Sequence, residues 1–429
     1  MFDLGIKNGF VYLDGGLQKI NLYVNDEKIC AISTEEFECK NNVDAAYRFV
    51  LPGFIDPHVH FSLGVGSNIS KDDFEEGSKE AALGGVTTYI DFLDPVKKAD
   101  DIFLEFEKRR KMAGKSYVDY AFHTTIANPI DSAEKIIKES KKYGINSIKL
   151  FTTYSNTDRR TYDDYIYDLL SISRTEKAVI VVHAENDDLI EKNKDILVKD
   201  HEKSRPVITE NIEVVKLSQM ARNTGGKLYI VHVSAGSSVK ALREQFSEEL
   251  KRHDIILESC PHYFLLNSSR LEDKEGYKYT MTPPIRSEKE RILLNDEINY
   301  ISTIGTDHCP YTKEQKNHKY TKDIPMGIGG IRYSFLNMYT KYGIKIIDKF
   351  TNGPAKAYSL KEKGSLLPGY DADITIFNPK EKTTVEDEMS VYKGKILDGK
   401  IEEVYCRAMP VVKNGNIVEH LGKYIKRGE

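Results

Sequence analysis

Two histidines stand one residue apart near the start of the chain, in the segment Pro52-Gly-Phe-Ile-Asp-Pro-His58-Val-His60. Residues i and i+2 of a strand face the same side, so both imidazoles can reach one ion. Imidazole nitrogen is a common ligand of Zn²⁺. A single pair of this kind can equally be two polar histidines at the end of a strand. The interpretation as a metal site therefore depends on further ligands.

Three more residues with metal-binding side chains come at the ends of apolar, β-branched runs. His183 ends the run in VIVVHAEND, His232 ends the run in YIVHVSAG, and Asp307 follows the run in STIGTDHCP. Four histidines and one aspartate exceed the three protein ligands that a catalytic Zn²⁺ usually takes. The set indicates two metal ions, provided that one more residue bridges them.

Lys149 is a charged residue inside the apolar run Ser147-Ile-Lys-Leu-Phe151. Burying a charge is costly unless it is paired or neutralised, so the lysine either pairs with a carboxylate inside the fold or loses its proton. Deprotonating an ordinary lysine at pH 7 costs about 4.6 kcal/mol, and two neighbouring cations lower that cost. A neutral amine can add CO₂ and become a carbamate, which is a carboxylate able to bridge two metals. This modification of Lys149 is a hypothesis.

The elements that must position these residues alternate regularly along the chain. Eight short β-branched runs are separated by amphipathic, charge-rich segments that predict helices. The predicted strands are 54–60, 86–92, 118–125, 147–151, 178–183, 228–233, 255–259 and 302–306. The predicted helices are 71–83, 99–112, 132–143, 161–174, 208–223, 237–252 and 288–300.

This alternation predicts an α/β protein whose parallel strands close into a (β/α)₈ TIM-like barrel, with an open doubly wound sheet as the alternative. Barrel enzymes build their sites at the carboxyl ends of the strands, which is where the metal-type residues stand. Short strands separated by tight turns at 3–12, 20–24 and 28–32 return after 368–377 and at 403–414. We therefore predict a barrel domain at 51–364 and a small β-sandwich domain assembled from 1–50 and 365–429.

The composition excludes several other classes of protein. The chain has 429 residues, 62 Lys+Arg against 66 Asp+Glu, and a formal net charge of −4. Interspersed charges of both signs give no basic field for nucleic acid and no basic amphipathic face for a membrane. The aliphatic runs are far shorter than the roughly 18 residues that span a bilayer, and the start MFDLGIKNG lacks a signal-peptide core. Five scattered cysteines favour free thiols in a reducing compartment, so we expect a cytoplasmic protein.

In its motifs and their order, the chain resembles the cyclic amidohydrolases over nearly its whole length. This branch of the metal-dependent amidohydrolase superfamily includes dihydropyrimidinase (hydantoinase), allantoinase and dihydroorotase. The resemblance implies two divalent metal ions per chain, expected to be Zn²⁺, bridged by a CO₂-derived carbamate on Lys149. It implies that Asp307 also moves protons during catalysis. The metal ligands implied in this way are His58, His60, Lys149, His183, His232 and Asp307.

Within the branch, dihydropyrimidinases and hydantoinases resemble this chain most. Their tyrosine five residues after the bridging lysine, which polarises the scissile carbonyl, corresponds to Tyr154. The segments SKDDF and GGVTTYIDF also follow their pattern. The resemblance implies that main-chain groups near Thr282 and Met326 hold the substrate. The implied reaction opens a dihydropyrimidine or hydantoin ring to an N-carbamoyl or ureido acid.

Dihydroorotase and allantoinase are the alternative activities. Dihydroorotases place a carboxylate-binding arginine two residues after the second histidine, where this chain has Ser62, and an asparagine where it has Thr282. The segment Glu258-Ser-Cys-Pro-His262-Tyr, however, is more similar to allantoinases and some dihydroorotases. His262 could assist catalysis or be structural.

Two further positions depart from the dihydropyrimidinase pattern. Met326 stands where that family has an asparagine, and Arg332 stands where it has a glutamate. A cation at Arg332 would suit an acidic substituent on the substrate.

An alternative of another class is a non-enzymatic, dihydropyrimidinase-related assembly protein. Such relatives have lost metal ligands, whereas this chain keeps all six, which favours an enzyme. The near-zero net charge fits a small, neutral cyclic amide or ureide as the partner. The resemblance also implies a homo-oligomer, a tetramer or a dimer, with the C-terminal segment as one candidate contact.

Overall fold

The computed structural model describes residues 1–192 and 194–428. Its centre is an eight-stranded sheet in the order β17-β16-β15-β14-β13-β12-β11-β8, in which every neighbouring pair is parallel. Beyond their ends, the first and last strands are joined by a parallel bridge between Val59 and His308. The predicted (β/α)₈ barrel is thus confirmed. Its strands are β8 (Phe54–Asp56), β11 (Val86–Phe92), β12 (Asp119–Thr125), β13 (Ser147–Phe151), β14 (Val179–His183), β15 (Leu228–Ile230), β16 (Ile255–Ser259) and β17 (Thr303–Ile304).

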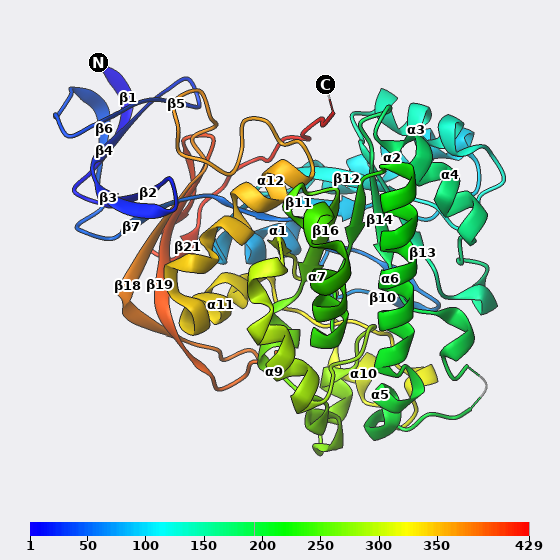
Figure 1. The fold of residues 1–429 in the computed structure, drawn as a ribbon. Coiled ribbons are helices and arrows are strands. Elements are labelled where there is room, and N and C mark those ends of the chain that lie inside the picture. Colours follow the sequence, from blue (N-terminus) through cyan, green and yellow to red (C-terminus); the bar gives the residue numbers. More distant parts are fainter. Residues whose placement is uncertain (193, 429) are drawn as a thin grey trace.

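Helices cover the outside of this sheet, as Figure 1 shows for α2, α3, α4, α6 and α7. Helix starts and stops follow local chemistry: the Asp73 side chain caps the first turn of α1, and Gly225 ends α6 with a left-handed φ of 67°. The longer helices are α1 (Phe74–Leu83), α2 (Ile102–Met112), α3 (Ala133–Lys142), α4 (Asp163–Ser173), α6 (Val207–Thr224), α7 (Gly236–Lys251), α9 (Glu288–Asp296) and α11 (Ser334–Tyr342). The shorter ones are α5 (His201–Ser204), α8 (Pro261–Leu265), α10 (Lys313–Lys316) and α12 (Asn352–Ala357).

Three barrel strands end earlier than the hydrophobic pattern predicts. β15 stops at Ile230 and β17 at Ile304, and His232 and Asp307 follow them with left-handed φ angles of 40° and 51°. β8 stops at Asp56, directly before Pro57. A left-handed residue cannot continue a strand, so the chain turns away from the ladder at these points. The metal-type residues of these strands therefore lie in the loops above the barrel.

The two ends of the chain form further sheets that lie to the left of the barrel in Figure 1. One has the order β5-β4-β1-β6, and the other has the order β21-β20-β19-β18-β7-β2-β3, which joins strands from both termini. The two sheets share a core that includes Leu22, Val50 and Ile376, which confirms a small sandwich built from both ends. The N-terminal strands are β1 (Phe2–Lys7), β2 (Phe10–Leu13), β3 (Gly16–Lys19), β4 (Asn21–Asn25), β5 (Lys28–Ser33), β6 (Cys39–Asp44) and β7 (Phe49–Pro52). The C-terminal strands are β18 (Ile374–Thr384), β19 (Ile396–Cys406), β20 (Met409–Lys413) and β21 (Asn416–Ile417).

A buried group of charges connects the barrel to the sandwich. Lys363 Nζ lies 2.8 Å from Asp119 Oδ2 at the start of β12 and 2.7 Å from Asp373 Oδ2 before β18. Arg407, which follows β19, also pairs with Asp119. Buried charges are tolerated only when they are paired in this way. The cluster therefore ties the relative placement of the two sets of sheets to specific partners.

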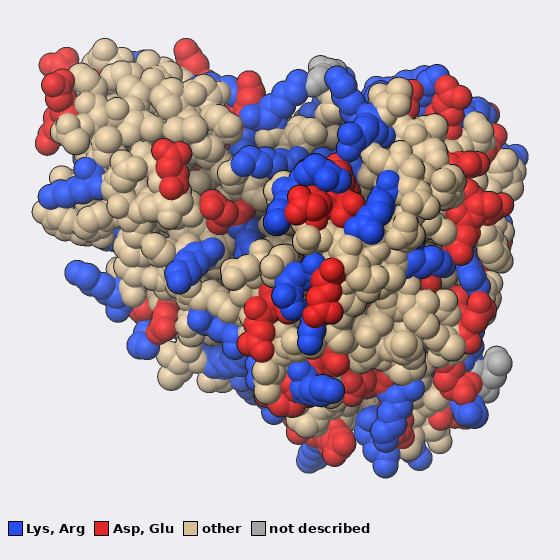
Figure 2. Space-filling view, in the orientation of Figure 1, with Lys and Arg blue, Asp and Glu red and all other residues tan. Residues whose placement is uncertain are grey.

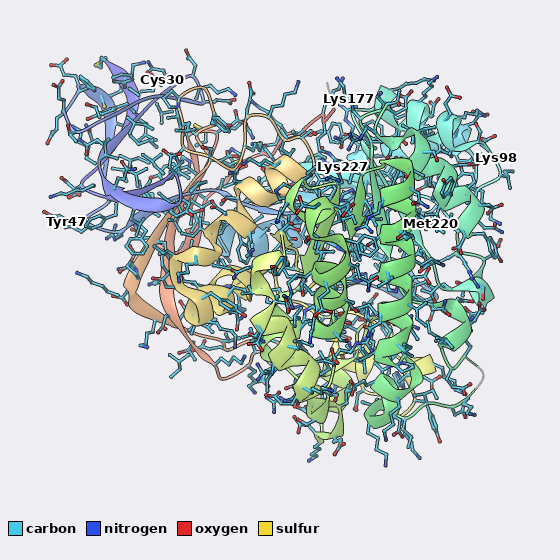
Figure 3. All side chains as sticks on the ribbon, in the orientation of Figure 1. Cys30, Tyr47, Lys98, Lys177, Met220 and Lys227 are labelled. Carbon is cyan, nitrogen blue, oxygen red and sulfur yellow. The ribbon has the colours of Figure 1, made fainter. Side chains whose placement is uncertain are left out.

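The surface and the cysteines agree with the composition. Figure 2 shows Lys and Arg interspersed with Asp and Glu over the visible face. Within residues 1–192 and 194–428, no helix is long and apolar enough to cross a membrane. All five cysteines are free thiols, as predicted; Cys30, labelled in Figure 3, is exposed on β5, and Cys260, Cys309 and Cys406 are buried.

Candidate metal centre

The residues that follow β8 and β17 meet at one edge of the barrel. His58 Nε2 lies 3.3 Å and His60 Nε2 lies 3.0 Å from Asp307 Oδ1. The backbone supports this meeting, because His60 N donates a hydrogen bond to the His308 carbonyl at 2.9 Å. Two imidazole nitrogens and a carboxylate oxygen, all within 4.8 Å of one another, form a donor set suited to a divalent metal.

A second pair of donors lies beside the first group. His183 Nδ1 and His232 Nε2 are 3.0 Å apart, and both residues are buried. The ring centroids of His58 and His232 are 5.5 Å apart, so the two groups are neighbours. Burial lowers the pKa of both His183 and His232. Both imidazoles are thus neutral at pH 7, the form that binds metal.

Two buried glutamates hold the outward nitrogens of these histidines. Glu258 Oε1 lies 2.7 Å from His58 Nδ1, and Glu185 Oε2 lies 2.7 Å from His183 Nε2. A carboxylate behind an imidazole places the proton on the outer nitrogen and leaves the lone pair of the inner one facing the site. Hydrogen-bonding between His58 or His183 and these carboxylates therefore favours metal-binding tautomers.

Sequence reasoning missed both glutamates as part of the site, although each left a signal. Glu258 is a charged residue inside the apolar run of β16, which is the same anomaly that singled out Lys149. Glu185 follows His183 by two residues in the HAEN segment. Room for Glu258 also requires Gly305, since a Cβ there would lie 2.8 Å from Glu258 Cδ and 3.0 Å from His58 Cβ.

Lys149 lies on β13 and is buried. Its Nζ is 5.3 Å from the ring centroids of both Phe92 and Phe151. Burial lowers the pKa of Lys149 to about 8, against the opposing effect of the carboxylates of Asp307 and Glu258. Those carboxylates already contact His58 and His60. The local environment thus favours loss of the lysine proton.

Asp307 is held both electrically and by the backbone. Burial alone would raise its pKa, but His58, His60 and Lys149 together lower the pKa well below its usual range. Asp56 fixes the preceding residue, because its Oδ2 accepts from Thr306 Oγ1 at 2.5 Å and its Oδ1 accepts from Thr306 N at 3.1 Å. Asp307 is therefore an ionised carboxylate in a defined position.

Three residues of this region have a left-handed backbone conformation. Tyr154, His232 and Asp307 have φ angles of 70°, 40° and 51°. Non-glycine residues in this conformation cost free energy and persist only where the surroundings impose it. The strain observed here is a feature typical of sites at which side-chain direction matters more than local stability.

Tyr154 follows β13 and faces the same region as His183, with the two ring centroids 5.4 Å apart. Burial raises the pKa of the Tyr154 hydroxyl, partly offset by Arg205 and by a hydrogen bond to the side chain of Thr282. The structure therefore brings the side chain of Thr282 to the hydroxyl of Tyr154.

Met326 is placed by a buried lysine. Lys316 Nζ donates to the carbonyls of Thr280 at 2.7 Å and Gly327 at 2.6 Å, and Gly327 N donates to the Thr280 carbonyl at 3.2 Å. The loop that carries Met326 is thereby fastened to the loop that carries Thr282.

His262 and Arg332, which the sequence also singled out, differ in their burial and in their partners. His262, on α8, is buried, and within the described residues its Nε2 has no hydrogen-bond partner; burial lowers its pKa to about 4. Arg332 lies beside α1, where its Nη1 is 3.3 Å from Glu80 Oε1, and both side chains are partly exposed. Arg332 thus forms an ion pair with a partly exposed glutamate.

The fold and the donor set are those of a metal-dependent barrel hydrolase, and the chain belongs to the amidohydrolase family, whose model matches residues 49–418. It is 32% identical to a D-hydantoinase from Geobacillus stearothermophilus over 99% of this chain and 96% of that protein. The solved D-hydantoinase (dihydropyrimidinase) from Thermus sp. superposes with a TM-score of 0.92 at 29% identity and covers 99% of each chain. An L-hydantoinase (dihydropyrimidinase) from Arthrobacter aurescens superposes with a TM-score of 0.89 at 25% identity and covers all of each chain.

Proposed function

We propose that this protein hydrolyses a cyclic amide, opening the ring of a dihydropyrimidine or a hydantoin to an N-carbamoyl or ureido acid. The observation that carries the proposal is that two groups of donors lie side by side above the barrel. His58 and His60 meet Asp307 in one group, His183 meets His232 in the other, and the rings of His58 and His232 are 5.5 Å apart. Similarity to hydantoinases along the whole chain supports the choice of substrate class.

The donor set fits two divalent metal ions, with Zn²⁺ as the expected metal. His58, His60 and Asp307 would hold one ion, and His183 and His232 would hold the other. In this arrangement His232 must carry its proton on Nδ1, and that atom has no hydrogen-bond partner among the described residues and is free to do so. When bound, such ions supply Lewis acidity and lower the pKa of a water molecule to about 7.

We further propose that Lys149 carries the CO₂-derived carbamate between the two ions. A comparison with Lys316 supports this assignment, because burial lowers the pKa of both amines, to about 8 and about 7. Lys316 Nζ is occupied by two carbonyl oxygens, which would repel a carbamate. Lys149 Nζ instead lies over two aromatic rings, beside donors that would share a bridging carboxylate.

The remaining steps belong to the protein's own side chains. Asp307, an ionised carboxylate, would accept a proton from the attacking water and return it to the leaving nitrogen. Tyr154, kept protonated by the raised pKa of its hydroxyl, would donate a hydrogen bond to the carbonyl oxygen as negative charge develops there. Main-chain groups of Thr282 and Met326 would hold the polar edge of the ring.

The test is a panel of dihydrouracil, both enantiomers of a 5-substituted hydantoin, allantoin and dihydroorotate, with ring opening followed by chromatography. We expect opening of dihydrouracil or hydantoin by zinc-loaded protein, and no opening after metal removal. Activity confined to dihydroorotate or allantoin would refute the proposed substrate class. Lys149→Ala should lose bound metal, measured by elemental analysis, whereas Lys316→Met should retain it.

Three further properties are part of the proposal. The resemblance to cyclic amidohydrolases supports a homo-oligomer, a tetramer or a dimer, which light scattering would measure. Five free thiols support a reducing, cytoplasmic location. We also propose that the domains divide at 1–50 with 365–429 and at 51–364; limited proteolysis should then cut first near these boundaries.

A further inference from the structure

An ion pair behind the metal centre controls the outward nitrogen of His183. Glu185 Oε2, which contacts His183 Nε2, also accepts from Arg205 Nη2 at 2.6 Å, and Arg205 Nε lies 3.1 Å from Glu185 Oε1. The Glu185 side chain is fully buried, and that of Arg205 is only 12% exposed. A fork of this kind fixes both the charge and the orientation of a carboxylate. Arg205 thus determines where Glu185 presents its oxygen to His183.

The same guanidinium also lies over the ring of Tyr154. Arg205 Cζ is 5.4 Å from the centroid of the Tyr154 ring. Tyr154 has the left-handed backbone noted above, so its ring depends on its neighbours for its direction. Arg205 therefore contacts the ring of Tyr154 directly and the imidazole of His183 through Glu185.

Arg205 reaches this position from a separate segment of the chain. It follows the short helix α5, and its carbonyl accepts a hydrogen bond from Arg286 Nη1 at 2.5 Å. The loops of Tyr154 and His183 are themselves tied together, because Thr152 Oγ1 donates to the carbonyls of His183 and Glu185, each at 3.0 Å. The two functional side chains thus lie on one joined pair of loops, and Arg205 contacts Tyr154 on one loop and Glu185 on the other.

We propose that Arg205 is a positioning residue that couples the two halves of the site. Through Glu185 it keeps His183 Nδ1 directed at His232, and through its guanidinium it keeps the Tyr154 ring beside His183. This inference rests on the proposed function for the role of Tyr154, but its His183 branch concerns metal binding alone.

Replacement of Arg205 should therefore have two separable effects. Arg205→Met removes the fork and leaves Glu185 buried without its cation, so zinc affinity should fall about 10–100-fold, as for other residues that orient metal ligands. Arg205→Lys keeps the positive charge but lacks the forked, planar guanidinium. Its zinc affinity should therefore lie between those of the wild type and Arg205→Met. Because Tyr154 loses its support as well, kcat at saturating zinc should also fall.

Metal-free protein should be titrated with Zn²⁺ against a chromophoric chelator, and kcat and KM should then be measured at saturating zinc. Arg222→Met is the matched control. Arg222 also forms a forked pair, with Glu249 at 2.8 and 3.0 Å, and its Cζ lies 4.2 Å from the Phe246 ring centroid, but it is placed between α6 and α7. The kinetic comparison is repeated in a Tyr154→Phe background.

The expected result is weaker zinc binding for Arg205→Met and Glu185→Gln, wild-type binding for Arg222→Met, and a smaller kcat loss from Arg205→Met when Tyr154 is already Phe. Wild-type zinc affinity in Arg205→Met would overturn the inference. An undiminished kcat loss in the Tyr154→Phe background would overturn its Tyr154 branch. If Arg205→Met does not fold, zinc affinity is measured in Arg205→Lys and Glu185→Gln instead, and wild-type affinity in both would overturn the inference.

The two hypotheses fail in different ways. Wild-type protein that binds zinc but opens no ring in the panel would refute the proposed function, while weakened zinc binding in Arg205→Met would still support the His183 branch. Wild-type protein that binds no zinc would refute both.

Discussion

Replacing Glu258 by glutamine removes one charge behind His58 while nearly preserving the shape of the side chain. Glu258 Oε1 accepts from His58 Nδ1 at 2.7 Å and from His232 N at 3.1 Å, and its Oε2 accepts from the Tyr229 hydroxyl at 2.8 Å. A glutamine can keep its carbonyl on the first two donors. Its amide can face Tyr229, whose hydroxyl lies 2.6 Å from Thr303 Oγ1 and can donate there instead.

The magnitude of the change follows from what is lost. Hydrogen bonds to charged groups contribute about 1.5–3 kcal/mol and neutral ones about 0.5–1.5 kcal/mol, so the His58 bond should weaken by about 1–1.5 kcal/mol. Since 1.4 kcal/mol is about a factor of ten, zinc affinity should fall about tenfold in Glu258→Gln. The free energy of unfolding of the metal-free protein should change by less than about 1 kcal/mol, because a neutral amide costs less to bury than a carboxylate, which offsets the weaker bond to His58, and every donor keeps an acceptor.

The assay combines zinc titration against a competing chelator with urea unfolding of the metal-free protein. Glu290→Gln is the control, since Glu290 is also buried and accepts from Ser237 N at 2.8 Å, but it lies on α9. Its zinc affinity should equal that of the wild type. A folded Glu258→Gln protein that binds zinc as tightly as the wild type would show that Glu258 does not tune His58.

Three other changes test separate parts of the structure. Tyr154→Phe should lower kcat about 10²–10³-fold, the usual cost of losing one donor to a developing oxyanion, with metal content unchanged by elemental analysis; an unchanged kcat would remove Tyr154 from the mechanism. Burial lowers the pKa of Lys316 from 10.5 to about 7, so the unfolded chain binds more protons between these values. The stability of the wild type should therefore rise with pH from about 7 to 10.5, and Lys316→Met should flatten this rise in urea titrations at several pH values; equal slopes would contradict the assignment. Arg332→Ala should alter kcat/KM less than twofold and stability by less than about 1 kcal/mol, because its pair with Glu80 is partly exposed; a large rise in KM for acidic substrates alone would return Arg332 to the site.

Much of the fold could be predicted because strand and helix periods are local properties of the chain. β11, β13 and β16 begin and end where their β-branched runs do. The prediction was less accurate for the terminal strands. The predicted strand 3–12 is two strands, β1 and β2, separated at Asn8, which has a φ of 60°. The sequence does carry a signal for this turn, because Asn8 is followed by Gly9, and Asn-Gly pairs are typical of tight turns between strands.

The donors of the candidate site could be chosen from the sequence because histidines and a lysine at the ends of apolar runs contradict local propensity. The structure brings His58, His60 and Asp307 together and pairs His183 with His232. It does not place Arg332 among them, since the Arg332 guanidinium pairs with Glu80 on α1 instead. The sequence pattern alone does not show in which direction a substituted side chain points.

The sequence by itself determined the barrel, the sandwich built from both termini, and the kinds of donor atoms at the ends of the strands. These depend on hydrophobic periods and on single side chains whose chemistry is out of place in an apolar run. Only the tertiary structure decided which nitrogen of His58 and of His183 faces inward, because Glu258 and Glu185 hold the other one. Only the tertiary structure, too, decided that Arg205 contacts both Tyr154 and Glu185. These contacts join residues on different strands and loops, so they exist only after the barrel has closed.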